Sequence, residues 1–346
     1  MENKSVLQEA ISAVVNGQSL SCEKAQAVME AIMEGEATPA QIGALLATMR
    51  MKGETVDEVV GFASGMRAKV NFVPTVTDGL LDTCGTGGDG LHTFNISTAS
   101  AIVAAAGGVR VAKHGNRAMS SKSGSADVLE ALGVNIGLGS EEAAKCLNAV
   151  GICFMFAQVY HPSMKHAAGP RRELGLRTVF NLLGPLTNPA GADRQLLGVF
   201  DRNKTGLMAN VLRELGTKRA LVVGSHDGLD EISLSAPTRV TELKDGEVRT
   251  YDITPDDLGL RSCSLDEIKG GDAGENAETI RHVFSGSRGA YRDIVLANAG
   301  ACFYVSGVSG TLQEGVKRAA DAIDSGGALQ KLNDLVKLTR ELNHVS

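Results

Sequence analysis

The repeating pattern of the chain changes near residue 72, and this change limits the possible folds more than any other feature. Before it, only helical patterns occur, in about four apolar-periodic stretches. After it, short apolar runs such as "LLDTC", "VRVA" and "ICFMFA" alternate with glycine-containing loops and helical stretches such as "STASAIVAAAGG" and "SADVLEALG". Strands that alternate with helices favour a largely parallel sheet. We therefore predict an α/β fold: a small helical N-terminal domain over 1–72 and a large α/β domain with a mostly parallel central sheet over 73–346.

Two later segments depart from this alternation. Residues 161–194 look helical and are rich in Arg, Pro and Gly. We expect them to lie across the mouth of the sheet or to return to the helical domain, which would then include part of about 165–190. The run "RVTELKDGEVRTYDI" alternates with period two around Asp245 and Gly246, which predicts a hairpin and some antiparallel pairing late in the sheet.

Charge and composition exclude several classes of protein. The net charge of −6 over 346 residues argues against a nucleic-acid-binding surface. The N-terminus carries Glu2 and Glu9 without an apolar core, and no apolar run approaches the ~18 residues of a membrane span. A cytoplasmic protein without a membrane partner is expected. The six cysteines form no C-x-x-C pair, so we expect buried free thiols.

Residues 85–90, "GTGGDG", match the glycine fingerprint of dinucleotide-binding proteins, but their surroundings do not. That fingerprint requires the third glycine to begin a helix and an acidic residue about 20 positions later. Here "LHTFN" follows Gly90, and no acidic residue occurs from Leu91 to Ala126. The same stretch instead carries four basic residues: Arg110, Lys113, Arg117 and Lys122. An NAD site is therefore rejected in favour of a phosphate site.

Two loops could bind phosphate groups at the carboxyl ends of neighbouring strands. In the first, glycines expose backbone N–H groups, and a helix that begins near Ser97 and Thr98 adds its positive end. The second, "KHGNRAMSSKSGSAD", offers basic, amide and hydroxyl side chains. Each loop alone has a plainer interpretation, as an ordinary turn or a solvated connector. Together they favour a ligand with more than one anionic group.

An acidic loop, "HDGLDEISLS", follows the strand "RALVVGS" and places Asp227, Asp230 and Glu231 at a strand end. Such carboxylates can hold Mg²⁺ together with substrate phosphate; a solvated acidic turn is the alternative. No motif for nucleophilic catalysis or zinc hydrolysis occurs, and His114 and His161 are compatible with bases, ligand contacts or simple packing. A reaction that needs only positioning and charge stabilisation fits best.

Four runs of sequence, spread over nearly the full length, resemble the anthranilate phosphoribosyltransferase family of tryptophan biosynthesis: "GTGGDGLHTFNIST", "KHGNRAMSSKSGSADVLEALG", "HPSMKHAAGPRRELGLRTVFNLLGPLTNP" and "DGLDE". The resemblance implies a fold like those of nucleoside phosphorylases and phosphoribosyltransferases, with a substrate cleft between the two domains of a homodimer. It also implies a Mg²⁺-dependent glycosyltransferase that moves the phosphoribosyl group of phosphoribosyl diphosphate (PRPP) to the amine of anthranilate. The products are phosphoribosylanthranilate and diphosphate, in the second step from chorismate to tryptophan.

The resemblance also implies the binding residues. Mg²⁺ would be held by Ser97, Asp230 and Glu231. Anthranilate would contact Gly85, Asn116 and Arg171. The PRPP contacts come from the two loops, with only the backbone of Ala118 and Met119 counting: Gly85, Gly88, Asp89, Thr93, Asn95, Ile96, Ser97, Thr98, Lys113, His114, Gly115, Asn116, Arg117, Ala118, Met119, Ser120, Ser121 and Ser125.

Simple chemistry agrees with this interpretation. Cleavage at the anomeric carbon leaves negative charge on diphosphate, which Mg²⁺ and Lys113 can stabilise without a covalent nucleophile. Arg171 can hold the anthranilate carboxylate with two parallel hydrogen bonds. The Gly- and Pro-rich segment 183–191 suggests a hinge for domain closure. A pyrimidine nucleoside phosphorylase and a non-enzymatic nucleic-acid-binding relative remain the rival interpretations.

Overall fold

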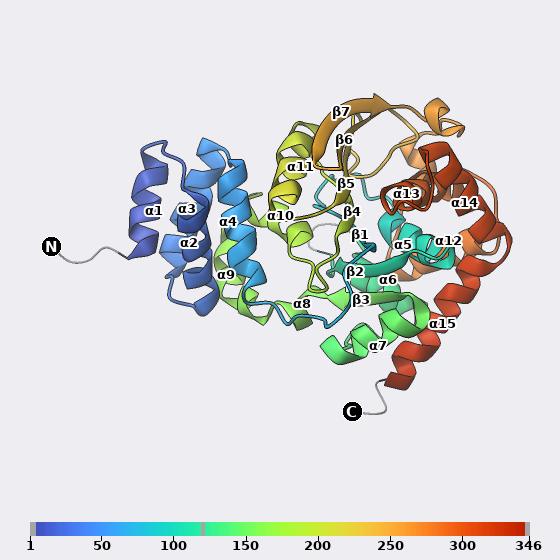
Figure 1. Cartoon of the computed structure of the whole chain (residues 1–346), viewed down its shortest axis with the longest axis horizontal. Helices are drawn as coiled ribbons and strands as arrows, with labels where there is room; N and C mark the ends of the chain where they lie inside the picture. Colours follow the sequence, from blue (N-terminus) through green and yellow to red (C-terminus); the bar gives the residue numbers. More distant parts are fainter. Residues whose placement is uncertain (1–4, 119–121, 343–346) are drawn as a thin grey trace.

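The computed structural model describes residues 5–118 and 122–342, which form a helical part and a larger part built on one sheet (Figure 1). Hydroxyl N-caps begin each of the first four helices, at Ser5, Ser21, Thr38 and Thr55. Thr38 and Thr55 also form capping boxes with Gln41 and Glu58. The four helices are α1 (Val6–Val15), α2 (Cys22–Glu34), α3 (Pro39–Lys52) and α4 (Val56–Arg67).

The sheet has seven strands in the order β3-β2-β1-β4-β5-β6-β7. Pairing is parallel from β3 through β5, and antiparallel at β6 and β7. The expected hairpin turns at Asp245 and Gly246, both with positive φ. The sequence pattern did not reveal β4. The strands are β1 (Leu80–Gly85), β2 (Arg110–Gly115), β3 (Ile152–Phe156), β4 (Arg194–Gly198), β5 (Arg219–Ser225), β6 (Thr238–Lys244) and β7 (Glu247–Ile253).

Helices cover both faces of the sheet and divide the buried apolar side chains into two cores. One core packs the C-terminal helices and α5 (Ile96–Ala106), α6 (Ser125–Leu132) and α7 (Ser140–Val150) on one face. The other joins α1 to α4 with α11 (Thr205–Glu214) and with side chains of β4, β5 and β6, such as Leu197 and Val222. The C-terminal helices are α12 (Ala273–Phe284), α13 (Ala290–Val305), α14 (Leu312–Asp324) and α15 (Gly327–Leu342).

The segment after β3 folds into short helices and crosses to the helical part. Its longest helix, α9 (Lys165–Leu174), packs on α2 and α3, far from its chain neighbours in β3 (Figure 1). The others are α8 (Ala157–Tyr160), α10 (Phe180–Leu183) and two 3₁₀ turns, η1 (Pro162–Met164) and η2 (Gly184–Leu186). Side chains presented by α9 therefore lie between the helical part and the sheet.

Within the described residues, no helix combines the length and the apolar character needed to cross a membrane. All six cysteines are free, as expected. The expectation that they are buried is correct for Cys146, Cys153 and Cys302, whereas Cys22, Cys84 and Cys263 are half-buried.

Candidate active site

The two glycine- and serine-containing loops leave the same edge of the sheet, because β1 and β2 are parallel neighbours. β1 also pairs with β4, and the chain reverses its course across the sheet between these two strands. The helix after β1, α5, and the helix after β4, α11, belong to the cores on opposite faces. The boundary of β1 and β4 is therefore a topological switch point, where open α/β sheets bind their ligands.

Glycines at this boundary leave room for Asp230. A Cβ atom on Gly85, the last residue of β1, would lie 2.4 Å from Asp230 Oδ2. A Cβ atom on Gly198, the last residue of β4, would lie 1.6 Å from the Asp230 carbonyl oxygen. The backbone N–H of Gly87 donates to Asp230 Oδ2 at 2.8 Å. Asp230 is thus fixed against both strand ends and the first loop.

The acidic residues at this edge repel one another. Burial, and then the charge of Asp89, raise the pKa of Asp230 to about 7. Burial, and then the charge of Asp230, raise the pKa of Glu231 well above its usual value. Both side chains are half-buried, and the positive charge of Lys113 offsets only part of this effect. A bound cation would relieve the repulsion.

The predicted Mg²⁺ ligands lie together and have suitable chemistry. The Ser97 backbone N–H donates to the Glu231 carboxylate, and Asp230 precedes Glu231 in the chain. Two carboxylates and a hydroxyl are oxygen donors of the type that Mg²⁺ prefers. Among residues 5–118 and 122–342, no three His, Cys, Asp or Glu side chains are arranged to hold a metal ion, so a serine and substrate oxygens would complete the shell.

Lys113 points from β2 toward this acidic group. Its Nζ donates to the Thr83 carbonyl at 2.6 Å and to Ser97 Oγ at 3.2 Å, and the side chain is buried. Arg110, counted with the same local positive charge in the sequence, lies instead at the amino end of β2 and donates to Thr75 and Val76. The basic charge at the binding edge is therefore smaller than the sequence suggested.

The first loop supplies backbone groups more than side chains. Gly87, Gly88 and Gly90 have positive φ values of 66°, 80° and 77°, a conformation that favours glycine. Asp89 accepts a hydrogen bond from the Leu91 N–H, and the backbone of Thr93 forms an isolated antiparallel β-bridge with that of Lys269. The side chains of Ile96 and Thr98 are buried. These two predicted PRPP contacts therefore present no exposed side chain to a ligand.

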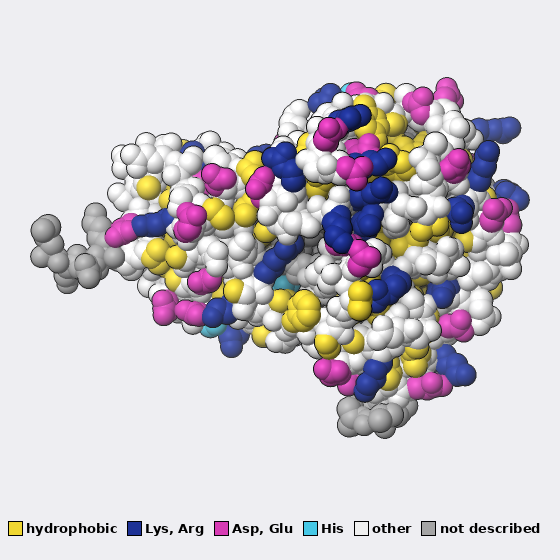
Figure 2. Space-filling view, viewed as in Figure 1, with side chains coloured by type: hydrophobic (Ala, Val, Ile, Leu, Met, Phe, Trp, Pro, Cys, Tyr) yellow, Lys and Arg dark blue, Asp and Glu magenta, His cyan; other side chains and the backbone are white. Residues whose placement is uncertain are grey.

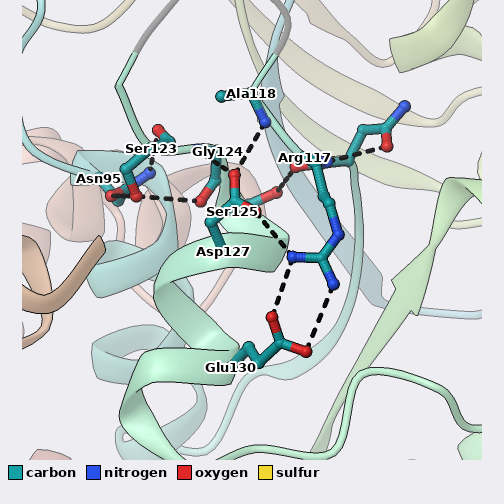
Figure 3. A network of polar contacts seen from close by, with 9 residues as sticks. Asn95, Arg117, Ala118, Ser123, Gly124, Ser125, Asp127 and Glu130 are labelled. Carbon is teal, nitrogen blue, oxygen red and sulfur yellow. Dashed lines mark hydrogen bonds and ion pairs between the residues drawn. The ribbon is translucent and has the colours of Figure 1, made fainter. Parts of the chain in front are cut away.

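The second loop touches the first and closes on itself. Asn95 Nδ2 donates to the Ser123 carbonyl at 3.2 Å and so joins the loops (Figure 3). Ser125 Oγ donates to the Asn116 carbonyl, and a Cβ atom on Gly115 would lie 2.1 Å from Ser125 Oγ. Three predicted PRPP contacts, Met119, Ser120 and Ser121, lie outside the described residues.

Histidines beneath the second loop are packed together and uncharged at neutral pH. The rings of His114 and His161 have centroids 5.0 Å apart. Burial, and then the nearby His161, lower the pKa of His114 to about 3, and burial lowers that of His161 to about 4. The backbone N–H of His114 donates to the buried Asp82. The predicted PRPP contact His114 is therefore a neutral, enclosed side chain.

Two arginines of the segment that begins with α9 stack on aromatic rings. The guanidinium of Arg171 lies over the Phe180 ring at 4.8 Å, and burial lowers its pKa. Arg177, which the sequence analysis did not single out, stacks on Phe200 at 4.3 Å, and its guanidinium would lie 3.2 to 3.3 Å from a Cβ atom on Gly88. Within the described part of the chain, neither has a carboxylate partner. Arg177 is a candidate because it stacks on Phe200 and approaches Gly88, which are both distant from it in sequence. No local sequence pattern could have indicated it.

Lysine and arginine side chains gather near the middle of the face shown in Figure 2, over the central strands of the sheet. Arg117 is not available to add to them. Its guanidinium forms ion pairs with Asp127 and Glu130 of α6 (Figure 3). Its side chain is therefore turned toward that helix.

Family models match both parts of the chain. The model described as glycosyl transferase family, a/b domain, matches residues 77–329, and that described as glycosyl transferase family, helical bundle domain, matches residues 8–70. The matches agree with a helical part followed by an α/β part.

Close relatives carry one name. An anthranilate phosphoribosyltransferase of Brevibacillus brevis is 56% identical over 341 residues, covering 99% of this chain and 100% of the relative. Another, from Acetivibrio thermocellus, is 54% identical over 334 residues, covering 96% and 97% of the two chains.

Solved structures agree with these relatives. The crystal structure of anthranilate phosphoribosyltransferase from Thermus thermophilus has a TM-score of 0.90 at 44% identity, covering 96% of this chain and 99% of that one. The enzyme from Saccharomyces cerevisiae in complex with PRPP and Mg also has a TM-score of 0.90, at 25% identity, covering 98% and 99%. With its helical part, its sheet and its acidic switch point, this chain belongs to the anthranilate phosphoribosyltransferase family.

Proposed function

We propose that this protein transfers the phosphoribosyl group of PRPP to the amine of anthranilate, with Mg²⁺, in tryptophan biosynthesis. The observation that carries the proposal is the cluster of Asp230, Glu231 and Lys113 at the β1/β4 switch point, beside two donor-rich loops. The relatives bear the name of this enzyme, and the yeast enzyme was solved with PRPP and Mg. The rival phosphorylase and nucleic-acid-binding interpretations lack such support.

The loops would bind PRPP through backbone N–H groups and hydroxyls. Glycine backbone of the first loop, the start of α5 and the second loop surround the same edge of the sheet, where they can bind phosphate and diphosphate oxygens. When bound by Ser97, Asp230 and Glu231, Mg²⁺ would supply positive charge to the leaving diphosphate. Lys113 adds a second positive charge from beneath.

Anthranilate would be held by its carboxylate. Arg171, stacked on Phe180 and without a carboxylate partner among the described residues, can clamp that group, and Asn116 and Gly85 are the other proposed contacts of anthranilate. The amine of anthranilate is already neutral at pH 7, so alignment with the anomeric carbon is the main requirement. No covalent nucleophile is needed.

The direct test follows the fluorescence of anthranilate with the purified protein, PRPP and Mg²⁺. We expect a loss of signal that requires all three, with controls that omit PRPP or contain excess chelator. If folded protein produces no loss, the proposal is wrong. Phosphorolysis of thymidine or uridine would then support the phosphorylase interpretation.

A homodimer, a cytoplasmic location and domain closure are part of the same proposal. The large exposed apolar side chains of Val15 and Met51 lie on helices of the helical part, where we place the dimer contact. Six unpaired cysteines suit a reducing compartment. The helical domain, residues 1–72 with part of 165–190, would close on the α/β domain, with residues 183–191 as the hinge. Identical scattering profiles with and without both substrates would contradict this closure.

A further inference from the structure

One carboxylate holds both ends of the second loop. Asp127 is the third residue of α6, and its Oδ2 accepts hydrogen bonds from the backbone N–H groups of Ala118 and Gly124, each at 2.9 Å (Figure 3). These two residues flank the central part of the loop. The other oxygen, Oδ1, accepts a hydrogen bond from Arg117 at 2.8 Å. Three donors from the loop therefore converge on a single side chain.

The two ends of the loop also touch directly. A Cβ atom on Gly124 would lie 2.4 Å from Ala118 N and 2.6 Å from the Asn116 carbonyl oxygen, so only glycine permits this approach. The Ala126 N–H donates to the same Asn116 carbonyl at 3.2 Å. Asp127 thus stabilises a closed loop whose close contact requires Gly124.

The charge of Asp127 does not favour an anionic ligand by itself. Burial would raise the pKa of Asp127, but the hydrogen bonds from Ala118, Gly124 and Arg117 lower it below its usual value, so the group is ionised at neutral pH. An ionised carboxylate beside a phosphate loop repels phosphate. Arg117 offsets part of this charge, and Glu130 fixes Arg117 in place through a second ion pair. The benefit of Asp127 must therefore lie in the shape of the loop.

We propose that Asp127 is a positioning residue for PRPP, because its carboxylate holds the two ends of the second loop in the geometry that receives the substrate. The proposal rests on the function proposed above. It assigns Arg117 to the support of the loop through Asp127, in place of a side-chain contact with PRPP.

The test compares Asp127→Ala with Glu130→Ala, a matched control on the same helix. Glu130 also binds Arg117, but it contacts neither loop N–H group. For Asp127→Ala, all three hydrogen bonds from the loop are lost, including both from backbone N–H groups, and we expect KM for PRPP to rise roughly tenfold or more. KM for anthranilate and the melting temperature should change little. Glu130→Ala should keep KM for PRPP close to that of the wild type.

Two further variants separate loop geometry from charge. Asp127→Asn keeps an oxygen that can accept from both N–H groups, so its KM for PRPP should lie between those of the wild type and Asp127→Ala. Gly124→Ala forces the loop ends apart while the carboxylate remains, and should also raise KM for PRPP. Wild-type KM values in Gly124→Ala would overturn the proposal even if Asp127→Ala failed to fold.

Other outcomes would overturn it as well. One is an equal effect of Asp127→Ala and Glu130→Ala on KM for PRPP; another is a parallel rise of both KM values with a lower melting temperature. The wild-type protein in the same anthranilate fluorescence assay distinguishes the two proposals. An inactive, folded wild type overturns both, whereas an active wild type with an unchanged KM in Asp127→Ala overturns only the role of Asp127.

Discussion

Two acidic groups lie in different parts of the molecule and have opposite surroundings. Glu58 of α4 is fully buried, and its carboxylate accepts hydrogen bonds from the Leu20 and Thr55 N–H groups and pairs with Lys52 at 2.8 Å. Asp230 and Glu231, at the sheet edge, face each other's charge, and their pKa values are raised. The helical part thus provides its buried carboxylate with a cation and hydrogen-bond donors. The sheet edge does not provide enough positive charge for its two carboxylates.

This difference separates a residue that stabilises the fold from residues that bind a ligand. A buried carboxylate with its own cation and N–H donors contributes to the folded state. Carboxylates held together without enough positive charge favour a cation from solution, and perturbed pKa values of this type are typical of functional sites.

Removal of the charge at the sheet edge should abolish most of the activity. We expect Asp230→Asn combined with Glu231→Gln to lower kcat/KM by roughly a thousandfold, because the site loses its cation ligands. Initial rates of anthranilate fluorescence loss, measured over a range of Mg²⁺ concentrations, check this. If the double variant keeps activity within tenfold of the wild type, Asp230 and Glu231 are not cation ligands needed for the reaction.

Glu58→Gln should instead affect stability alone. Its neutral amide removes the charge that pairs with Lys52 and leaves one of the two N–H donors, Leu20 or Thr55, without an acceptor, so the free energy of unfolding should fall by about 3 kcal/mol. Urea denaturation measures this, and the KM values should not change. Glu314→Gln is the matched control, because Glu314 also completes a capping box but is exposed. An equal loss in both variants would contradict the account of Glu58.

Much of the comparison follows from the sequence, and part of it does not. The strand before "DGLDE" and the two glycine- and serine-containing loops are local patterns, and local patterns predicted these elements well. The burial of Glu58 and its pairing with Lys52 depend on how α4 packs, which no local pattern specifies.

The site shows the same limit. Asp230 approaches Gly198 because β4 lies beside β1, and the sequence pattern did not reveal β4. Arg177 reaches Gly88 from a segment that is distant in sequence, and Arg110 lies at the opposite end of its strand from the loops. Strand order and the direction of each side chain are tertiary properties. The sequence therefore indicated the chemistry of the candidate site, but it indicated only some of the residues that lie there.

Arg171→Ala tests the contribution of α9, the helix that packs on α2 and α3. We expect KM for anthranilate to rise at least tenfold, because the carboxylate loses a bidentate partner, while KM for PRPP changes far less. Steady-state kinetics with each substrate varied in turn measures both. The adjacent, exposed Arg172→Ala is the control. Equal effects on both substrates would count against the assignment.

The smallest effect is a gain in stability. Because folding raises the pKa of Glu231, its ionised form opposes folding above the ordinary Glu value of about 4.3, and the penalty grows with pH up to the folded-state value. In chelator at pH 8, Glu231→Gln should therefore be more stable than the wild type by roughly 1 kcal/mol. The gain should disappear near pH 4, where the carboxyl is protonated in both states. If Glu231→Gln is less stable than the wild type at pH 8, the Glu231 carboxylate has enough hydrogen-bond donors and positive charge around it, as the Glu58 carboxylate does.

The most direct single measurement is the PRPP-dependent loss of anthranilate fluorescence against Mg²⁺ concentration, for the wild type, Glu58→Gln and Glu231→Gln at a temperature where all three are folded. The account predicts saturable Mg²⁺ dependence with the same midpoint for the wild type and Glu58→Gln, and little activity for Glu231→Gln at any Mg²⁺ concentration. Equal Mg²⁺ curves for the wild type and Glu231→Gln, or a wild type that consumes no anthranilate, would contradict it.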